Sequence, residues 1–243
     1  YKYNIILANS DENNQKEVQV LNTLLAKQVD GLIYMGHSIS DEIRAEFSRS
    51  KTPIVLAGSI DPDEQVGSVN IDYVEAVKDA TLKLINNGNE KVAFICGNLQ
   101  FPINSQYRLR GYKEALNEAG IAYDESLIFE TEYSYNAGEV LFSKVQAAGA
   151  TAAVVSDDEL AVGVLNGAVD AGVQIPTDFE IITSNNTKLT EMVRPKLTSI
   201  SQPLYDMGAV AMRLLTKMMN KEEISDKTIL LPYSIVDRQS TKH

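Results

Sequence analysis

The sequence predicts an α/β protein built from two similar, doubly wound parallel sheets. Short apolar runs of strand length alternate with amphipathic runs of helix length, and this alternation repeats through two halves of the chain. The strand runs are apolar almost throughout, which is typical of parallel sheets covered by helices on both faces. Because open α/β sheets bind ligands at the carboxyl ends of their strands, two such halves predict two lobes with a cleft between them.

The first half of the sequence begins with a predicted buried strand at residues 3–7. An amphipathic helix is expected over residues 14–28, because four apolar residues recur on one helical face: Val18, Leu21, Leu24 and Leu25. The other elements expected in this half are strand 29–35, helix 41–49, strand 53–57, a short extended piece 68–71, helix 73–86 and strand 91–96.

The second half repeats this order of elements. They are helix 105–119, strand 127–130, helix 136–148, strand 152–155, helix 159–171, and strands 179–183 and 198–201. A last helix is predicted over residues 203–220, because Pro203 suits a first helical position and apolar residues recur at helical spacing behind it. These apolar residues predict one buried face, and they are Leu204, Met207, Ala211, Leu214, Leu215 and Met218.

The outer face of the helix predicted at 203–220 combines charged side chains with small apolar ones. Asp206, Arg213 and Lys217 fall on a narrow arc, with Ala209 and Val210 beside them. Arg213 and Lys217 are four residues apart, a like-charge spacing that costs about 0.2–0.5 kcal/mol. Two interpretations stay open. The face is either a solvated surface or a docking face for a phosphorylated partner, since the Arg fork matches a phosphate bidentately.

The composition describes an acidic, globular chain. It has 243 residues, 44% of them apolar, with a formal net charge of -11 and a pI near 4.7. Such a chain buries a large core but is a poor nucleic-acid ligand by itself, because Lys and Arg supply most non-specific affinity. Cys96 is the single cysteine, and its apolar surroundings predict a buried hydrophobe in a reducing cytoplasm. No apolar run reaches the roughly 18 residues of a membrane span.

The sequence offers little support for catalysis, and we expect neither an enzyme nor a bound metal or cofactor. His37 and His243 are far apart and adjoin no nucleophile motif. Neither a GxxxxGK[ST] phosphate loop nor a GxGxxG fingerprint occurs. The acidic run at residues 61–64 is interpreted as an exposed turn rather than a metal loop, because Pro and Asp favour turns.

One stretch carries a resemblance to a known family. The run QPLYDMGAVAMRLLTK at residues 202–217, with MVRPKLTSIS before it and DRQSTK near the end, resembles the regulatory core of the LacI/GalR transcription-regulator family. The resemblance spans essentially the whole chain. It implies a periplasmic-binding-protein-like fold whose chain crosses between the lobes three times, with residues 1–98 and 203–222 in one lobe and 99–202 and 223–243 in the other.

The same resemblance sets expectations for what surrounds this core. Family members carry an N-terminal helix-turn-helix headpiece and a hinge helix, and the present sequence begins at the position of the second strand of the first lobe. The resemblance therefore implies that operator DNA is bound through a headpiece that is not in this chain. It also implies a cytoplasmic homodimer that presents two headpieces to a two-fold operator.

Within the family, the chain is most similar to regulators of carbon catabolite control in low-GC Gram-positive bacteria. There the corresponding helix docks the phosphocarrier HPr when HPr is phosphorylated on a serine. The resemblance places Arg213 on the phosphate. The full set of partner contacts that it implies is Tyr205, Asp206, Ala209, Arg213, Leu214 and Lys217.

The resemblance also implies an effector cleft lined by Arg108, Asp157 and Asn185. From the residues alone, Arg108 is equally an exposed arginine in a first helical turn, and the alternative for Asp157 is an N-cap carboxylate at a helix start. Residues 183–186 read TSNN where the family usually has GFDN, so Asn185 replaces a sugar-binding carboxylate and Ser184 an aromatic ring. We therefore expect weak binding of uncharged sugars, with sugar phosphates as possible adjunct effectors.

The main alternative function is a periplasmic-type sugar-binding receptor of a transport system, which shares the two-lobed architecture. Fold alone does not separate a receptor from a regulator. The helix pattern at 203–220, the Asn185 substitution and an expected dimer favour the regulator.

Overall fold

The computed structural model describes residues 3–10, 14–36 and 39–242, and it divides into two compact units. The first unit comprises Tyr1–Asn70 and Leu204–Leu231, and the second comprises Ile71–Pro203 and Pro232–His243. The chain therefore passes between the units three times, after residues 70, 203 and 231. Each unit contains its own sheet, and the α/β class with two parallel-sheet lobes is confirmed.

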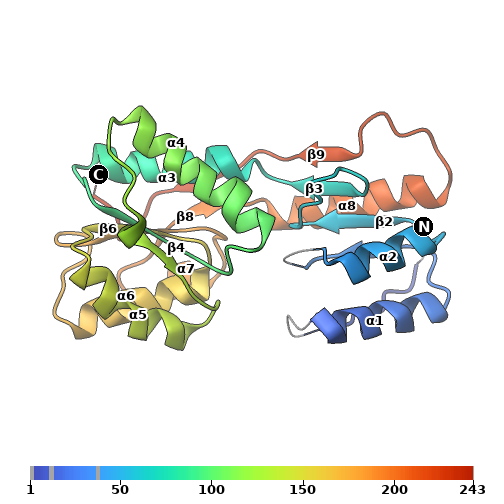
Figure 1. Ribbon diagram of the computed structural model, residues 1–243, viewed down its shortest axis with the longest axis horizontal. Helices are drawn as coiled ribbons and strands as arrows, with labels where there is room; N and C mark the ends of the chain where they lie inside the picture. The colour runs from blue at the N-terminus through green and yellow to red at the C-terminus, as the bar shows by residue number, and fades with distance from the viewer. Residues whose placement is uncertain (1–2, 11–13, 37–38, 243) are drawn as a thin grey trace. The chain divides into compact units, whose positions relative to one another are not determined.

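The first unit is built on a four-stranded parallel sheet in the order β1-β2-β3-β9 (Figure 1). Its strands are β1 (Leu32–Tyr34), β2 (Ile54–Ala57), β3 (Gly67–Asn70) and β9 (Thr228–Leu230). Its helices are α1 (Asn14–Ala26), α2 (Asp41–Arg49) and α8 (Leu204–Met219). These helices correspond to those predicted at 14–28, 41–49 and 203–220.

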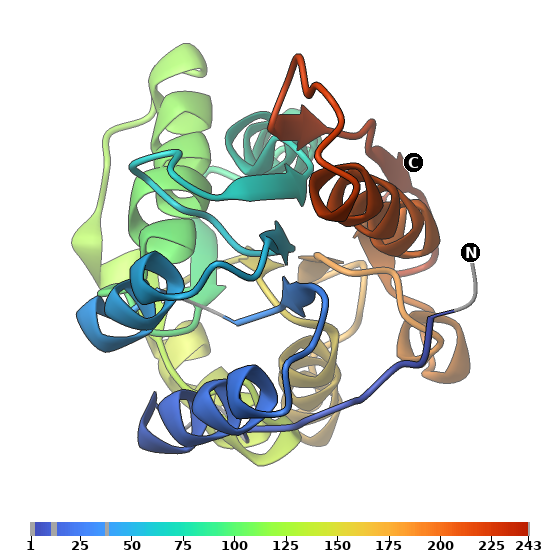
Figure 2. The same cartoon turned by 90° about the vertical axis from the view of Figure 1, so that its right-hand side faces the viewer.

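Alternate side chains of β2 build the two cores of the first unit. Val55 and Ala57 pack against α8, while Ile54 and Leu56 pack against α1 and α2. Figure 2 shows α8 on one side of the strands and α1 with α2 on the other. The predicted apolar stripe of α8 is buried at Met207, Ala211, Leu214 and Leu215. Leu204 differs, because it opens the helix and is 51% exposed.

The second unit has a six-stranded sheet in the order β10-β8-β7-β6-β4-β5, in which β10 runs antiparallel to β8. The strands are β4 (Val92–Cys96), β5 (Ile128–Glu130), β6 (Ala152–Val155), β7 (Glu180–Thr183), β8 (Thr198–Ser201) and β10 (Ser234–Val236). The helical elements are α3 (Tyr73–Asn86), the π-helix η1 (Ile103–Arg108), α4 (Leu109–Glu118), the short 3₁₀ turn η2 (Glu125–Leu127), α5 (Tyr135–Ala147), α6 (Asp158–Asp170) and α7 (Leu189–Met192). In Figure 1, α3 and α4 cover one face of this sheet, and α5 and α6 cover the other.

Two glycines allow α5 and α6 to pack backbone to backbone. A Cβ atom on Gly138 would lie 2.2 Å from the Leu160 carbonyl oxygen, and one on Gly163 would lie 2.1 Å from that of Tyr135. Real Cβ atoms do not approach so closely. Side chains at these positions would force the helices apart and open the core beneath them, which includes Phe142 and Val164.

The observed unit boundaries differ from the predicted lobes in two places. Helix α3 and strand β4 belong to the second unit, because β4 forms hydrogen-bonded pairs with β5 and β6. Strand β9 belongs to the first unit, because it pairs with β3. The first crossing therefore lies after residue 70 rather than 98, and the third after 231 rather than 222. Strand pairing is a non-local property that the local apolar pattern does not encode.

The predicted opening strand is a second correction. Residues 3–7 belong to no strand, and Ile5 and Leu7 are 90% and 93% exposed. A strand is stable only beside a hydrogen-bonded neighbour, and in the described part of the chain β1 pairs with β2. The apolar run predicts a strand but supplies no neighbour for it.

The acidic turn at residues 61–64 is a third correction, because Asp61 is buried rather than exposed. Its carboxylate accepts hydrogen bonds from Arg44 Nη2 at 2.8 Å and from the backbone amides of Gln65 at 2.8 Å and Val66 at 3.1 Å. Burial alone would raise the pKa of Asp61, but these donors outweigh it and hold the pKa below its usual value. Asp61 thus organises the turn instead of offering a metal ligand.

Replacing Asp61 by Asn is expected to lower the free energy of unfolding by about 1–3 kcal/mol at pH 7, because the amide presents N–H groups to a site filled with donors. The folded pKa is depressed, so the stabilisation is complete above the unfolded pKa of about 3.9 and is lost as pH falls through the folded pKa. Urea unfolding between pH 7 and pH 3 should show native and variant converging only at the acid end. The control is Asp63→Asn, since Asp63 meets the same Arg44 at 3.4 Å but is 67% exposed.

Candidate functional site

The predicted cleft residues Asp157 and Asn185 meet at the carboxyl ends of neighbouring strands of the second unit. Asp157 follows β6 and Asn185 follows β7, and Asn185 Nδ2 donates to Asp157 Oδ2 at 3.3 Å. Gln202 follows β8 and extends this contact, because its Nε2 donates to Asn185 Oδ1 at 3.0 Å and to the Ser184 carbonyl oxygen at 2.8 Å. Three strand ends thus contribute to one polar cluster.

Arg108 is the buried cation of the same unit. It is the last residue of η1 and only 8% exposed, so it is not the solvated first-turn arginine that the sequence left open. Its Nη1 donates to Asn104 Oδ1 at 3.1 Å and to the Tyr133 hydroxyl at 3.2 Å. Its guanidinium carbon lies 5.3 Å from the centre of the Tyr73 ring. Among the described residues, no carboxylate forms an ion pair with Arg108.

Tyr73 joins the arginine to the amide cluster. Its hydroxyl donates to Gln202 Oε1 at 3.5 Å, while its ring contacts the Arg108 guanidinium. A continuous chain of contacts therefore runs from Arg108 through Tyr73 and Gln202 to Asn185 and Asp157. We call these five residues the polar network. A buried cation and a run of amides at strand ends form a suitable site for an anionic, hydroxyl-rich ligand.

Asp157 is the N-cap that the sequence allowed, and its second carboxylate oxygen lies within the polar network. Its Oδ1 accepts the Leu160 amide at 3.0 Å, which makes it the N-cap of α6, and its Oδ2 faces Asn185. Burial raises the pKa of Asp157, although the Leu160 amide acts in the opposite direction. A partly buried carboxylate with a raised pKa at a strand end is a common feature of binding sites.

Asp158 fixes the loop that carries Asn185. It is 1% exposed and accepts hydrogen bonds from the Thr183 hydroxyl at 2.8 Å, the Asn185 amide at 3.1 Å and the Thr187 amide at 2.7 Å. The loop after β7 is therefore held from the start of α6. This explains how an asparagine on a loop has a defined place in the polar network.

Replacing Asn185 by Asp is expected to destabilise the chain in a pH-dependent way. The new carboxylate would face Asp157 across 3.3 Å in a partly buried site, and two carboxylates there share a proton, which raises one pKa. A raised folded pKa means that stability falls as pH rises from the unfolded pKa through the folded one. We expect a loss of about 1–3 kcal/mol at pH 7 that shrinks towards pH 4, measured by urea unfolding.

The matched control for this change is Asn186→Asp. Asn186 Oδ1 accepts from Arg238 Nη2 at 2.7 Å, so the same added charge would there meet a cation. This control should show no stability loss that grows with pH. If Asn185→Asp loses the same stability at pH 4 and pH 7, the two carboxylates do not interact and the proposed contact with Asp157 is contradicted.

Five of the six predicted partner contacts lie exposed on α8. Tyr205 is 87% exposed, and Asp206, Ala209, Arg213 and Lys217 are also exposed. The side chains of Arg213 and Lys217 form no hydrogen bond or ion pair with residues that the structure describes. We call these five residues the α8 face. Leu214 is a correction, because it is 4% exposed and packs in the core beneath the helix, where a docking partner has no access to its side chain.

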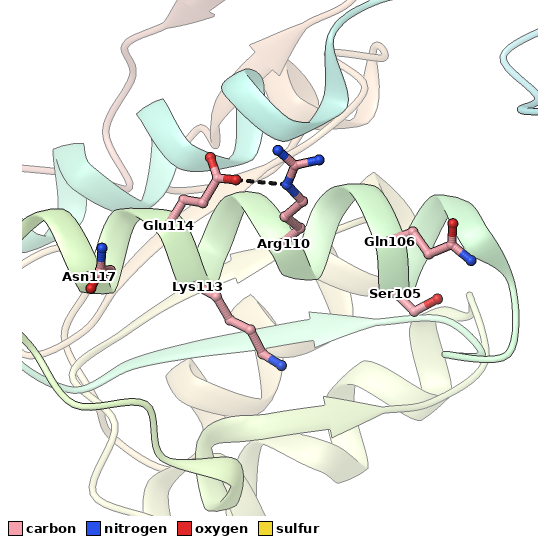
Figure 3. Close-up of a pocket in the computed structure, with 6 residues that line it drawn as sticks. All are labelled: Ser105, Gln106, Arg110, Lys113, Glu114 and Asn117. Carbon is pink, nitrogen blue, oxygen red and sulfur yellow. Dashed lines mark hydrogen bonds and ion pairs between the residues drawn. The ribbon is translucent and has the colours of Figure 1, made fainter. Parts of the chain in front are cut away.

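A shallow hollow of about 480 Å³ lies along α4 and η1 (Figure 3). It is lined by Ser105, Gln106, Arg110, Lys113, Glu114 and Asn117. Arg110 Nε pairs with Glu114 Oε1 at 2.7 Å, and Lys113 Nζ lies 4.4 Å from the centre of the Tyr123 ring. Both cations of the hollow already have partners within the chain. It is therefore a weaker anion site than the polar network.

Other chemistry has little support in the structure. Burial raises the pKa of the Cys96 thiol to about 12, so this cysteine is the inert hydrophobe that the sequence predicts. No cluster of three metal-ligating side chains occurs among the described residues, and no helix there has the length and hydropathy of a membrane span. His37 and His243 lie outside the described residues.

Comparison with known proteins first defines the class. Residues 81–241 match the family model of the periplasmic binding protein-like domain, which agrees with the two parallel-sheet units and the polar network at strand ends. The chain is 54% identical to catabolite control protein A of Streptococcus mutans, over 100% of this chain and 72% of that protein. Its fold matches the crystal structure of the transcription regulator CcpA of Lactococcus lactis with a TM-score of 0.95 and 51% identity, covering 99% of this chain and 88% of that one.

A more distant structural neighbour is a LacI-family regulator from Enterococcus faecium with bound ribose, at 25% identity and a TM-score of 0.82, covering 93% of this chain and 84% of that one. The chain belongs to the LacI family of transcription regulators, in the group of catabolite control protein A. It is thus a transcription regulator of carbon catabolite control. This assignment favours the regulator over the sugar-binding receptor that the sequence left open.

Proposed function

We propose that the chain is the effector- and corepressor-binding core of this regulator, and that the α8 face docks HPr phosphorylated on a serine. The observation that carries the proposal is the pair Arg213 and Lys217, which is exposed on α8 and has no ion-pair partner among the described residues. The chain around this pair has a net charge of -11. The two cations lie four residues apart on one face of α8, so that a single anionic group of a partner can contact both.

The chemistry of a seryl phosphate fits this pair. A phosphoserine adds about -1.5 to -2 charge and three acceptor oxygens, and an Arg fork binds two of them at once. The small side chain of Ala209 lies one turn before Arg213 and leaves room for a partner's backbone. Tyr205, one turn earlier, offers a large exposed ring of the kind enriched at protein interfaces.

The direct test is calorimetric titration of the chain with HPr and with its serine-phosphorylated form. We expect the phosphorylated form to bind about 10- to 100-fold more tightly, which corresponds to one bidentate charge-assisted pair of about 1.5–3 kcal/mol. HPr with serine replaced by glutamate serves as the control, because one carboxylate carries less charge and fewer acceptors than a phosphate. Equal affinity for phosphorylated and unmodified HPr would contradict the proposal.

The polar network is proposed as an adjunct site for sugar phosphates, with Arg108 as the anion receptor. An uncharged sugar should bind weakly, because Asn185 provides an amide where a carboxylate would form a charge-assisted hydrogen bond. The ribose-bound Enterococcus faecium neighbour has the same fold, so uncharged sugars belong in the same titration as hexose phosphates.

Operator DNA is proposed to bind through a headpiece outside this chain, in a cytoplasmic protein.

Homodimerisation is proposed because exposed apolar side chains lie on neighbouring helices of the second unit. Val169 of α6 is 49% exposed, and Leu189 and Met192 of α7 are 38% and 72% exposed. LacI-family regulators are usually dimers, which fits such a surface. We expect Met192→Glu to weaken dimerisation about tenfold or more in sedimentation velocity, because a charge would enter an apolar interface. The control is Tyr123→Glu, which also places a carboxylate at an exposed ring or apolar side chain, but beside α4, and it should leave dimerisation unchanged. A native chain that is monomeric at micromolar concentration would contradict the proposal.

A further inference from the structure

The methionines of this chain are concentrated on α8. Four of the six lie on that helix, at positions 207, 212, 218 and 219. Met207 is enclosed and only 4% exposed, whereas the other three are partly exposed and pack against the core cluster that α8 shares with β2 and β3. A partly exposed thioether at a core is accessible to small oxidants and also contributes to packing, so its oxidation affects the fold.

Met219 packs the end of α8 against the start of β1. It is the last residue of the helix, and Gly31 directly precedes β1. A Cβ atom on Gly31 would lie 2.9 Å from Met219 Sδ and 2.9 Å from Leu215 Cγ, so these two side chains fill the space that a larger residue would need. Leu215, one turn earlier, is 3% exposed. The end of α8 is therefore held on the sheet by a sulfur atom packed against a glycine.

Oxidation of this sulfur would change both its size and its polarity. With hydrogen peroxide as the oxidant, a lone pair of the sulfur attacks one peroxide oxygen, the O–O bond breaks, and the second oxygen leaves as water with both protons. The product is a sulfoxide, with a polar oxygen on an atom that lies against Gly31 and Leu215. That oxygen needs a hydrogen-bond donor or water, which the Leu215 side chain cannot supply, and an added atom overfills the contact with Gly31. Both costs are relieved when the last turns of α8 separate from β1.

The cations of the α8 face lie on the turns that this contact holds in place. Lys217 is two residues before Met219, and Arg213 is two residues before Leu215. At 100° per residue, a separation of two residues is a rotation of about 200°, so each cation points away from the inner contact that follows it. The packing against Gly31 thus supports the same helical turns that present Arg213 and Lys217 to a partner.

The exposed methionines outside α8 provide a contrast. Met35 and Met192 are 78% and 72% exposed. An oxidant reaches them readily, but a sulfoxide at either position stays in water and displaces no packed neighbour. Oxidation is therefore expected to change the fold at α8 and not at these two positions.

We propose that Met219 is a modification site, at which oxidation to the sulfoxide by a peroxide releases the end of α8 from β1 and lowers the affinity of the α8 face for its partner. Methionine sulfoxide reductases reverse this step. The effect on docking rests on the proposed function of the α8 face, whereas the release of α8 does not.

The test is mild treatment of the native chain with hydrogen peroxide, with the added oxygen located by peptide mass spectrometry. Once Met219 is converted, amide hydrogen exchange in a peptide covering residues 208–222 should accelerate by about tenfold or more, because the last turns of α8 open more often. Phosphorylated HPr should bind the treated chain about fivefold or more weakly, because binding must first reorder the helix. The two methionine sulfoxide reductases, one for each sulfoxide epimer, should together restore both quantities. A chain in which Met35 is oxidised and Met219 is not would overturn the proposal.

Two substitutions of Met219 make the test specific. Met219→Leu keeps an apolar side chain of similar volume that cannot be oxidised, so peroxide should change its exchange by no more than about twofold, although Met212 and Met218 still react. Met219→Gln places a polar group in the same contact without any oxidant, and it should accelerate exchange in the untreated chain by about tenfold or more. A Met219→Leu chain that responds to peroxide as the native chain does would assign the effect to another methionine and overturn the proposal.

Met35 supplies the matched controls. Met35→Leu should respond to peroxide as the native chain does, and Met35→Gln should leave exchange at α8 unchanged, because this side chain is exposed. If phosphorylated HPr does not bind even the untreated chain, the docking proposal is wrong, and hydrogen exchange alone then decides whether Met219 holds α8 in place. Native exchange rates in a chain whose Met219 is fully oxidised would refute that role.

Discussion

Replacing Arg213 by alanine is expected to abolish the preference for serine-phosphorylated HPr. Binding of the phosphorylated form should weaken by about 10- to 100-fold, because the bidentate pair with the phosphate is lost, whereas the already weak binding of unmodified HPr should change little. The two HPr forms should therefore bind the variant with nearly equal affinity. Titration calorimetry of both forms against native and variant chains measures this directly.

Two further variants separate the contribution of the bidentate guanidinium geometry of Arg213 from the contribution of positive charge. Arg213→Lys keeps the cation but loses the planar pair of donors, so it should weaken binding less than alanine does. Lys217→Ala should act mainly on the association rate and on its salt dependence, since a lysine at this position contributes a point charge. An alanine variant at 213 that still discriminates between the two HPr forms would mean that this face of α8 is only a solvated surface.

The stability of these variants provides an internal control. Arg213 and Lys217 are exposed and form no ion pair with the described residues, so their removal should shift the free energy of unfolding by no more than about 0.5 kcal/mol. A large loss of stability would show that the side chain has a structural partner. Loss of binding without loss of stability is the result that assigns Arg213 to the partner.

The elements that could be predicted from sequence are those whose signal is local. Helix α2 was expected at 41–49 and α3 at 73–86, and both begin and end there, because each has an N-cap, Ser40 or Asp72, before an apolar periodic run. Strand β6 was likewise predicted at its observed bounds. An apolar period and a cap are properties of neighbouring residues, so the sequence contains them in full.

The misplaced features depend on partners distant in sequence. Residues 3–7 have the composition of a strand but no neighbouring strand, and β4 was assigned to the wrong unit because its partners β5 and β6 come later in the chain. Asp61 was interpreted as an exposed turn because its partner Arg44 lies 17 residues earlier. In each case the outcome depends on pairing or contacts with residues distant in sequence, which the local pattern does not encode.

The candidate site shows the same division. Arg108, Asp157 and Asn185 were assigned through the family resemblance, but the residues that join them were not singled out. Tyr73 and Gln202 are 129 residues apart and look like an ordinary helix start and an ordinary strand end. The one available signal was a polar residue between a strand and Pro203, at a point where the chain was expected to change lobes.

Arg108 is buried without a counter-ion among the described residues, so its proposed role in anion binding is expected to lower the stability of the fold. The residue is only 8% exposed, and the hydrogen bonds and ring contact that the structure describes for its guanidinium are all with neutral groups. Removing a charge from water costs several kcal/mol unless an opposite charge offsets it. A side chain retained at such a cost is expected to serve a ligand that supplies the missing negative charge.

Replacing Arg108 by methionine should therefore weaken hexose 6-phosphate binding by about tenfold or more while leaving the unfolding temperature equal to or above that of the native chain. Methionine fills a similar volume and packs against the Tyr73 ring, and Tyr133 still donates to Asn104 Oδ1 at 3.0 Å, so neither polar neighbour is left unpaired. Arg110→Met is the matched control, since Arg110 is 64% exposed and paired with Glu114, and it should change neither quantity appreciably. The opposite result would be an Arg108→Met chain that is less stable than the native chain and binds hexose 6-phosphate equally well. Arg108 would then be a structural residue, because its buried charge would stabilise the fold and would not contribute to anion binding.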